Sequence, residues 1–393
     1  MKKVLYAFLL LSIAVLQVNC SNKVAAIDIT DQPADVQRAA VLAEAEWALQ
    51  QQPVTITAES SSKSTGGKHD FFSQADYFWP DPAKPNGAYI NKDGLSNPDN
   101  FVAHRKAMIR LSKIMGALAS AYVLTHDQKY VVQAMIHLKA WFINPETLMN
   151  PNLQFSQAVI GQYTGRNYGI IDTIHFLEVA QGVYAMQDDK AFDREVLAGV
   201  KNWFAEYTNW LTTSKMGLEE KNTKNNHSTC WLMQVACFAR LCNNTVLMDS
   251  CRERFKNVIL PNQMGTDGSF PLETARTKPY GYSLFNLDAM ATVCQILSTK
   301  KDRELWDYTT ADGRSVKKGI AFLYPYVLDK SKWPFKPDVM YWNDWPVAHP
   351  FLLFGSRAYH VKEWQKTWRS LEHDPKVEEV VRNLPIRHPL IWI

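Results

Sequence analysis

Two short segments carry side chains whose types suit the removal of a proton beside a carboxylate. Asn226 and His227 are adjacent, and Arg276 and Tyr282 follow together further along the chain. An amide and a guanidinium can hydrogen-bond a sugar carboxylate and hold the negative charge that develops when the C5 proton leaves. A phenol and an imidazole can serve as the base at C5 and the acid at the leaving oxygen O4. The set therefore predicts β-elimination at a uronic acid residue.

The stereochemistry of the sugar decides which group is the base. In β-D-mannuronate and β-D-glucuronate the C5 hydrogen and O4 lie on the same side of the ring, so one phenol can remove the proton and then deliver it to O4. We assign this double role to Tyr282, with Tyr280 as the alternative phenol. In the C5 epimer guluronate the two atoms lie on opposite faces, which would make His227 the base and Tyr282 the acid.

Each of these residues also has a purely structural interpretation. Asn226 would suit the N-cap of a helix, and His227 would suit an exposed position in its first turn. Arg276 is three positions from Glu273, the spacing of an ion pair on a helix. The tyrosines are common packing residues. The presence of amide, imidazole, guanidinium and phenol together favours the chemical interpretation.

Several blocks of the sequence, in the right order, resemble the alginate lyase superfamily with helical toroid folds. The resemblance covers roughly residues 65 to 300 and implies an (α/α) toroid with a polysaccharide lyase site, without a cofactor or an essential metal. The matching segments are Asn225-Asn226-His227, Glu273-Thr274-Ala275-Arg276 leading to Tyr282-Ser283-Leu284-Phe285-Asn286-Leu287, His69-Asp70-Phe71-Phe72-Ser73, Asp76-Tyr77-Phe78-Trp79-Pro80-Asp81-Pro82, Tyr89-Ile90-Asn91-Lys92-Asp93-Gly94 before Asn97-Pro98, and Gly165-Arg166-Asn167-Tyr168-Gly169-Ile170-Ile171-Asp172-Thr173.

Further side chains in these blocks and in two aromatic loops are candidates for a sugar-binding groove. Aromatic rings suit the apolar faces of sugars, and cations suit their carboxylates. The structural alternatives are a core histidine at position 175, a cover over the toroid for the loop aromatics, and core packing for Trp342. The substrate-binding candidates are Arg166, His175, His69, Tyr77, Trp79, Arg105, Tyr280 and Trp342.

Two other classes of function remain open at this point. Helical toroids also house glycoside hydrolases, which need two carboxylic acids facing the cleaved bond. Possible acids are Asp70, Asp93, Glu219, Glu220, Asp267 and Glu273, and no spacing singles out a pair. A non-catalytic uronan-binding lipoprotein is the other class. For a lyase, the natural polymer could be alginate, glucuronan or a mixed uronan, cut internally or from its ends.

The elements that must position these residues are predicted to be helices. Apolar residues recur at helical spacing, as in Leu111, Ile114, Met115, Leu118 and Tyr122. No βαβ alternation is visible, so we expect an all-α chain in which paired helices wind into an incomplete (α/α) barrel with long aromatic loops. The expected helices are 35–51, 130–142, 173–186, 191–212, 228–242, 245–258, 283–298, 304–328 and 364–371, besides the one around Leu111.

Composition narrows the partners. The chain of 393 residues has a net charge of +4 and no run of Lys and Arg, so nucleic acid is not an expected partner. An anionic polysaccharide is the expected one, and the 13 Trp and 16 Tyr are consistent with sugar stacking as well as with core packing. None of the cysteine spacings is a zinc pattern.

The N-terminal residues predict export. Lys2 and Lys3 precede an apolar run over 4–18, which is too short to span a membrane and resembles an export signal. Cys20 follows this run, as in a lipidated bacterial lipoprotein, and cleavage near Ala25 is the alternative. We expect a signal and tether over 1–25, one toroid domain over 26–393, and an exported protein that is periplasmic or anchored to a membrane.

The other cysteines are odd in number, so they cannot form a complete disulfide framework. Cys230 and Cys237 are seven apart on an expected helix and should lie in the core. Cys242 and Cys251 could pair across a loop in an exported protein.

Overall fold

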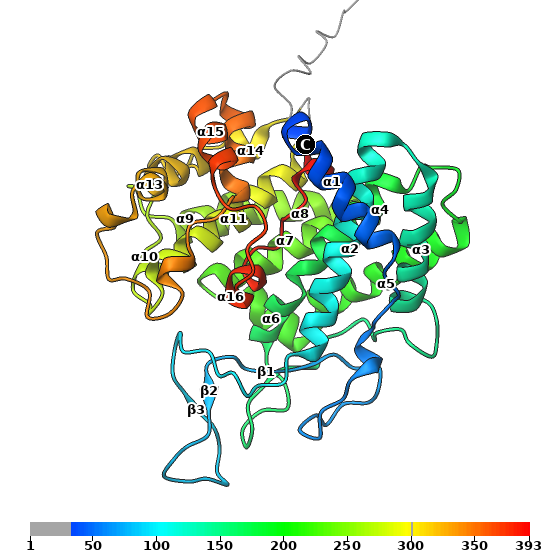
Figure 1. Cartoon of the computed structure of the whole chain (residues 1–393). Coiled ribbons are helices and arrows are strands. Elements are labelled where there is room, and N and C mark those ends of the chain that lie inside the picture. The colour runs from blue at the N-terminus through cyan, green and yellow to red at the C-terminus, as the bar shows by residue number, and fades with distance from the viewer. Residues whose placement is uncertain (1–32, 300–301) are drawn as a thin grey trace, which may run out of the picture.

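Helices account for most of the chain, and short strands and loops gather at one end of the helical body (Figure 1). The computed structural model describes residues 33–299 and 302–393. The expected export signal and Cys20 lie outside these residues.

An inner layer of helices runs through the middle of the molecule. Each inner helix packs against the next one in chain order, because α2 contacts α4, α4 contacts α7, α7 contacts α11 and α11 contacts α14. In α7 and α11 almost every residue is buried, as expected for helices enclosed on all sides. The inner helices are α2 (Ala103–Thr125), α4 (Phe176–Met186), α7 (Asn226–Leu241), α11 (Pro279–Leu297) and α14 (Pro350–Tyr359).

An outer layer covers the inner one, and each outer helix packs on an inner helix next to it in the chain. In α5 the buried residues include Val196, Val200 and Leu211, one apolar stripe that faces α7, and Asp193 caps its first turn. This alternation of inner and outer helices confirms the expected (α/α) toroid. The outer helices are α1 (Pro33–Leu49), α3 (Gln128–Phe142), α5 (Arg194–Thr213), α8 (Thr245–Arg254), α13 (Val316–Leu328) and α15 (Lys362–Ser370).

Shorter elements connect these layers. The short α-helices are α6 (Lys215–Lys221), α9 (Leu260–Gln263), α10 (Pro271–Thr274), α12 (Glu304–Asp307) and α16 (Glu378–Arg382). The 3₁₀ segments are η2 (Ile56–Ala58), η3 (Asn167–His175), η5 (Lys330–Lys332), η6 (Trp342–Asp344) and η7 (Pro389–Trp392), and η4 (Phe255–Ile259) is a π-helical turn.

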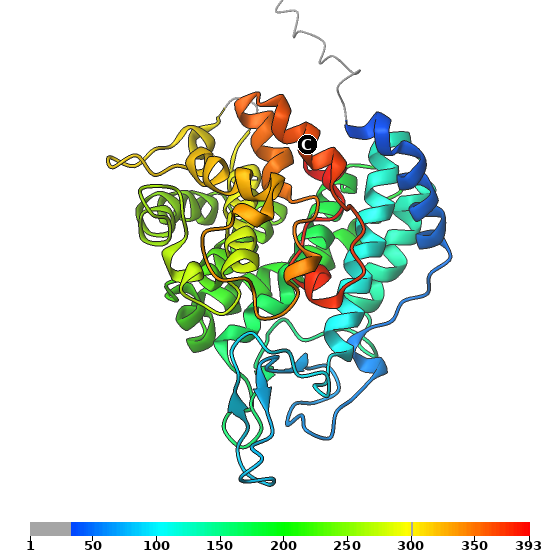
Figure 2. The same ribbon diagram turned by 60° about the vertical axis from the view of Figure 1, so that its left-hand side comes forward.

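Strands occur only as short pairs within the described residues. β1 (Phe72–Gln74) pairs in parallel with β4 (Phe155–Ala158), and β2 (Phe78–Trp79) pairs antiparallel with β3 (Ile90–Asn91). Figure 2 shows β2 and β3 in a segment that projects beyond the helices. We call this segment, residues 76–98, the arm. The arm and β1 together form one of the long aromatic loops that the sequence predicts.

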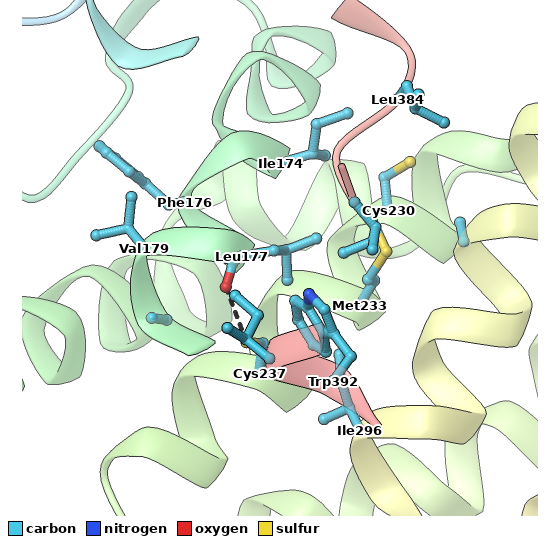
Figure 3. Packing of buried hydrophobic residues seen from close by; sticks show 14 of the residues in the cluster. Ile174, Phe176, Leu177, Val179, Cys230, Met233, Cys237, Ile296, Leu384 and Trp392 are labelled. Carbon is cyan, nitrogen blue, oxygen red and sulfur yellow. Dashed lines mark hydrogen bonds between the residues drawn. The ribbon is translucent and has the colours of Figure 1, made fainter. Parts of the chain in front are cut away.

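One continuous core joins the two layers. Figure 3 shows part of it, where Leu177 of α4, Met233 of α7 and Ile296 of α11 pack around Trp392. Cys230 and Cys237 lie in this core as expected. Cys242 and Cys251 are both free thiols, so the disulfide considered for them is not formed.

Several helix boundaries differ from the expected ones. The single helix expected over 304–328 is wrong, because a turn with Gly313 at φ 87° separates α12 from α13, and Ser315 then caps α13. The start of the helix expected over 173–186 is a 3₁₀ segment, and the end of that expected over 245–258 is the π turn. Helices α6, α14 and α16 were not anticipated.

Among the described helices, α2 alone is long and apolar enough to cross a membrane. Most of its apolar stretch is buried inside the protein, as in the core helix of a globular domain.

Candidate functional site

A cleft of about 390 Å³ opens where the arm, the start of α7 and the start of α11 meet. It brings together the four residues that sequence analysis assigned to catalysis. The lining residues are Asp76, Tyr77, Phe78, Asn91, Asp93, Gln157, Arg166, Tyr168, Ile171, Asn225, Asn226, His227, Arg276, Tyr282, Phe285, Arg382 and Asn383.

Asn226 begins α7, and a carboxylate from another element holds it. Its backbone N–H donates to Glu273 Oε1 over 2.8 Å, and its Nδ2 donates to Glu273 Oε2 over 2.9 Å. Asn226 is therefore not a side-chain cap of its own helix, since Glu273 of α10 takes that part. An amide nitrogen carries two hydrogens, so one N–H of Asn226 is left for a ligand in the cleft.

His227 is oriented by a buried glutamate. Its Nδ1 lies 2.6 Å from Oε1 of Glu220, which is fully buried on α6, and Asn167 donates to the other oxygen of Glu220 over 2.9 Å. A carboxylate accepts hydrogen bonds, so this contact places a proton on Nδ1 and leaves Nε2 as the second ring nitrogen for chemistry.

Arg276 lies between a carboxylate of the arm and the ring of Tyr282. Its Nη2 lies 2.8 Å from Asp93 Oδ1, and its guanidinium stands 4.0 Å from the centroid of the Tyr282 ring. Burial alone would raise the pKa of Asp93, but the Arg276 charge beside it lowers that pKa below its usual value. The guanidinium fork has further N–H groups that Asp93 does not use.

Tyr282 lies in the first turns of α11, and its hydroxyl donates to the hydroxyl of Tyr77 over 2.9 Å. Burial raises the pKa of Tyr282 well above that of a free phenol, while the charge of Arg276 and the hydrogen bond with Tyr77 oppose this rise. The phenol is nearly buried, at 7% exposed, yet lines the cleft. Tyr282 is thus a protonated phenol that lies between Tyr77 of the arm and the guanidinium of Arg276.

A buried ion network stands behind Tyr77. Within the network, Arg382 of α16 contacts Asp76 at 2.6 Å and Glu379 at 3.3 Å. Lys278 contacts Glu379 at 2.7 Å, and both Lys278 and Arg382 approach the Tyr77 hydroxyl to 3.4 Å. This network fixes the arm, the loop before α11 and the C-terminal segment around the two phenols.

Arg166 also lines the cleft, and its hydrogen bonds go to Gln157 and not to the network around Arg382. Its guanidinium stacks on Phe78 and Tyr168, 4.8 and 5.2 Å from the ring centroids. The Tyr168 ring in turn meets the His227 ring edge-on, with 5.0 Å between centroids. Arg166 and Tyr77 are the two expected substrate-binding residues that the structure places in the cleft.

The other substrate-binding candidates do not line the cleft, and their contacts are structural. His69 binds the Leu148 carbonyl, Trp79 donates to the Leu95 carbonyl and Tyr280 to the Tyr326 carbonyl. Arg105 is buried in an ion pair with Asp76. The remaining two are also enclosed: His175 is fully buried against the Arg382 carbonyl, and Trp342 packs on Tyr280.

Sequence analysis missed much of the supporting shell. Arg382 and Asn383 come from the C-terminal segment, which none of the recognised blocks covers. Glu220 was considered only as a hydrolase acid, and Glu273 as a hydrolase acid or an ion-pair partner of Arg276, although Glu220 lies only 7 residues before His227. The only signal in the sequence was the presence of two acids near Asn226 and His227. Their spacing alone could not show which residue each acid contacts.

The carboxylates that reach the cleft are Asp76 and Asp93, and both are held by arginines. Despite burial, the neighbouring guanidinium groups lower the pKa of each below its usual range. A glycoside hydrolase needs one carboxylic acid whose pKa is raised. Neither cleft carboxylate meets that need. Among the described residues, no group of three His, Cys, Asp or Glu side chains is arranged to hold a metal ion.

Comparison with known proteins gives a consistent result. A family model described as "Alginate lyase" matches residues 55–333. The crystal structure of an alginate lyase from Bacteroides ovatus is 31% identical and has a TM-score of 0.78, covering 93% of this chain and 95% of that chain. No curated protein sequence gives a significant match.

More distant structures share the fold. Alginate lyase A1-III from Sphingomonas species A1 is 13% identical with a TM-score of 0.56, covering 90% of this chain and 94% of that chain. A histidine-to-alanine variant of alginate lyase A1-III complexed with tetrasaccharide is 13% identical with a TM-score of 0.57 and the same coverage, 90% and 94%.

Proposed function

The chain belongs to the alginate lyase family of polysaccharide lyases, and on that premise we propose that it cleaves β-1,4-linked mannuronate or glucuronate polymers by syn β-elimination. The products are a 4,5-unsaturated uronate at one new end and a new reducing end at the other, where the former O4 stays on the anomeric carbon as a hydroxyl. The observation that carries the proposal is the meeting of Asn226, His227, Arg276 and Tyr282 in one cleft.

Neutralisation of the substrate carboxylate is the first task. The free N–H of Asn226 and the unused N–H groups of Arg276 donate to the carboxylate at C5, so the charge that forms after proton removal is met by donors already in place. One donor of this kind is typically worth roughly 10² to 10³ in rate. His227, fixed by Glu220, presents Nε2 to the same region and assists in binding the carboxylate.

Tyr282 carries the proton. The ionised phenol takes the proton from C5, the C5–H electron pair becomes the C4–C5 double bond, and the bond from C4 to O4 breaks. Tyr282 then gives the same proton to O4 and is again ionised, so the proton count balances. The cation of Arg276 against the Tyr282 ring supports the ionised form.

The test follows the conjugated alkene that elimination creates. Purified protein is mixed separately with polymannuronate, polyguluronate and glucuronan, and ultraviolet absorbance is recorded. A rise with polymannuronate or glucuronan is the expected result and ranks the two polymers. New reducing ends without absorbance would overturn elimination, and a rise with polyguluronate alone would make His227 the base.

We also propose that the protein is exported and held in the periplasm or on a membrane through Cys20. The support is the basic start, the apolar run over 4–18 and the cysteine directly after it. Metabolic labelling with a fatty acid analogue in a bacterial host, with Cys20→Ser as the unlabelled control, tests the anchor. Equal labelling of both forms would refute it.

A further inference from the structure

The cations that line the cleft differ in how their charge is compensated. Arg276 pairs with Asp93, Arg382 pairs with Asp76 and Glu379, and His227 pairs with Glu220. Arg166 makes no ion pair with any residue that the structure describes. Among the residues 33–299 and 302–393, it is therefore the one cation lining the cleft that forms no ion pair with a carboxylate.

The contacts of Arg166 hold its guanidinium in place without neutralising it. Nε donates to the Gln157 carbonyl over 3.1 Å, and Nη2 lies 3.4 Å from Gln157 Oε1. The guanidinium also lies over the rings of Phe78 and Tyr168, which are neutral groups and leave its charge uncompensated. The group is rigid, aimed by neutral partners and ready to donate.

A desolvated, unpaired guanidinium is costly. Burial lowers the pKa of Arg166, and the charges of Asp172 and Glu220, which form no ion pair with it, oppose this fall only in part. Partly buried charges normally have a partner, and this one lies in a cleft built for a polyanion. An anionic group of the ligand would supply the missing partner.

The position of Arg166 says which anion this is. Tyr168 separates its guanidinium from His227, so Arg166 is one aromatic ring away from the catalytic histidine. The carboxylate at the reacting sugar is taken by Asn226 and Arg276. The next carboxylate along the chain belongs to the neighbouring sugar.

We propose that Arg166 binds the carboxylate of the uronate adjacent to the cleaved one, and thereby selects polymers in which consecutive sugars are uronates. Tyr168, which is 40% exposed beside it, provides the face on which that sugar rests. This inference rests on the proposed function, because it names a second recognition point for the same reaction.

The first part of the test compares three forms of the protein. Arg166→Gln removes the charge, and Arg166→Lys keeps the charge but loses the planar fork. Arg240→Gln is the matched control, because Arg240 also lies between two rings, Tyr184 and Trp392, and donates to a carbonyl and a glutamine. Arg240 is near the other end of α7, about 20 Å along the helix from Asn226.

On the polymer that the wild type prefers, Arg166→Gln should lower kcat/KM roughly tenfold to a hundredfold, mostly through KM. The neighbouring carboxylate keeps its charge during the reaction, so kcat should change little. Arg166→Lys should fall between, and Arg240→Gln should match the wild type. A loss confined to kcat, or no loss in Arg166→Gln, would overturn the proposal.

The second part uses the same polymer after random reduction of half its carboxylates to primary alcohols. At low substrate concentration, a need for one carboxylate leaves about half of the wild-type rate, and a need for two leaves about a quarter. We expect about a quarter for the wild type and about half for Arg166→Gln. A wild-type rate of half would refute the second carboxylate site while leaving the lyase activity itself established. Failure of the proposed function would look different, since no form would then give unsaturated product from the intact polymer.

Discussion

Three of the four side chains proposed to act in catalysis are each held by a carboxylate from another element. Glu273 holds Asn226, Glu220 holds His227, and Asp93 holds Arg276. These acids orient the three side chains and balance the charge of Arg276 before substrate arrives. Substrate binding then needs little reorganisation of the site.

Loss of the phenol should stop the reaction while leaving the fold intact. In Tyr282→Phe the ring still packs against Arg276, but no oxygen can carry the proton from C5 to O4. We expect kcat to fall by about 10² to 10⁴ with binding nearly unchanged. Ultraviolet assays and calorimetric titration of an oligosaccharide measure the two quantities. Retention of most activity would move the proton to another group.

Loss of the Glu220 carboxylate should affect activity through His227, while the Asn167 amide can still donate to the remaining side-chain oxygen. Glu220→Gln keeps the volume, but its amide no longer fixes which ring nitrogen carries the proton. We expect kcat/KM to fall by about tenfold to a hundredfold, the usual cost of removing a group that orients a functional histidine. Glu219→Gln is the control, because Glu219 is exposed on the same helix and pairs only with Lys215. Equal activity of both variants would exclude an orienting role.

The pH profile should report the Tyr282 phenol. Because burial raises its pKa, the ionised base is scarce at neutral pH, and kcat/KM should rise as the pH increases above 7. Arg276 lowers this pKa and Asp93 raises it. Arg276→Gln should therefore displace the alkaline rise to higher pH, and Asp93→Asn to lower pH. Rates measured from pH 6 to 10 test both signs, and displacement in the same direction would contradict the assignment.

At this scale the reactive groups were predictable and their supports were not. The meeting of Asn226, His227, Arg276 and Tyr282 in one cleft was predictable because their chemistry is rare in combination and stands in recognisable blocks. The partners of these residues are ordinary acids whose roles depend on folding. Tyr280 was misassigned to substrate binding for the same reason. It is two positions from Tyr282, so it lies on nearly the opposite face of the helix and points into the core.

Among the elements, α16 makes a contribution out of proportion to its length. It lies beyond the segment that the family model matches, yet Arg382 reaches the cleft and Glu379 joins the network behind Tyr77. His175 of η3 anchors it through the Arg382 carbonyl. The C-terminal segment is thus part of the candidate site.

Breaking this attachment should cost stability. Arg382→Gln leaves Asp76 and Glu379 buried with fewer cations, and removing one partner from a buried ion pair typically costs about 3 to 5 kcal/mol. Denaturant unfolding should show a loss in that range, with partial recovery when Asp76→Asn is added. Lys376→Gln, at an exposed pair with Asp374, should change stability by less than about 0.5 kcal/mol. A loss of that small size in Arg382→Gln would show that the network is dispensable.

The long inner helices were well predicted because their apolar spacing is strong. Boundaries failed where local chemistry intervened, as at Gly313, and α14 was missed because it follows a loop and begins at Pro350. The sequence predicted long aromatic loops, but the antiparallel pair of β2 and β3 and the contact of Tyr77 with Tyr282 depend on tertiary packing.

For the molecule as a whole, a clasp joins the two ends of the described chain. Glu178 of α4 accepts hydrogen bonds from the backbone N–H groups of Arg387 and His388 and from His388 Nδ1, and His388 Nε2 lies 3.3 Å from Glu44 of α1. Lys113 of α2 also contacts Glu44, at 3.3 Å. Four elements therefore meet around one buried imidazole.

This clasp should make stability depend on pH. Burial by itself would lower the pKa of His388, but Glu178 and Glu44 raise it to about 9. Because the folded value lies above the ordinary one, the stabilisation is complete below about pH 6.5 and is lost as the pH rises through about 9, on the order of 3 kcal/mol in all. Thermal unfolding from pH 6 to 10 should show this loss. In His388→Gln the same decline should be largely absent, and an unchanged decline would place its origin elsewhere.

The clasp also sets how the molecule would sit on a support. Figure 1 places α1 and the C-terminus at one end and the arm with β2 and β3 at the other. A membrane anchor that precedes Pro33 would therefore leave the arm and the cleft beside it facing away from the membrane. An enzyme anchored in that way could cut the surface of a polymer gel that is too large to diffuse to it.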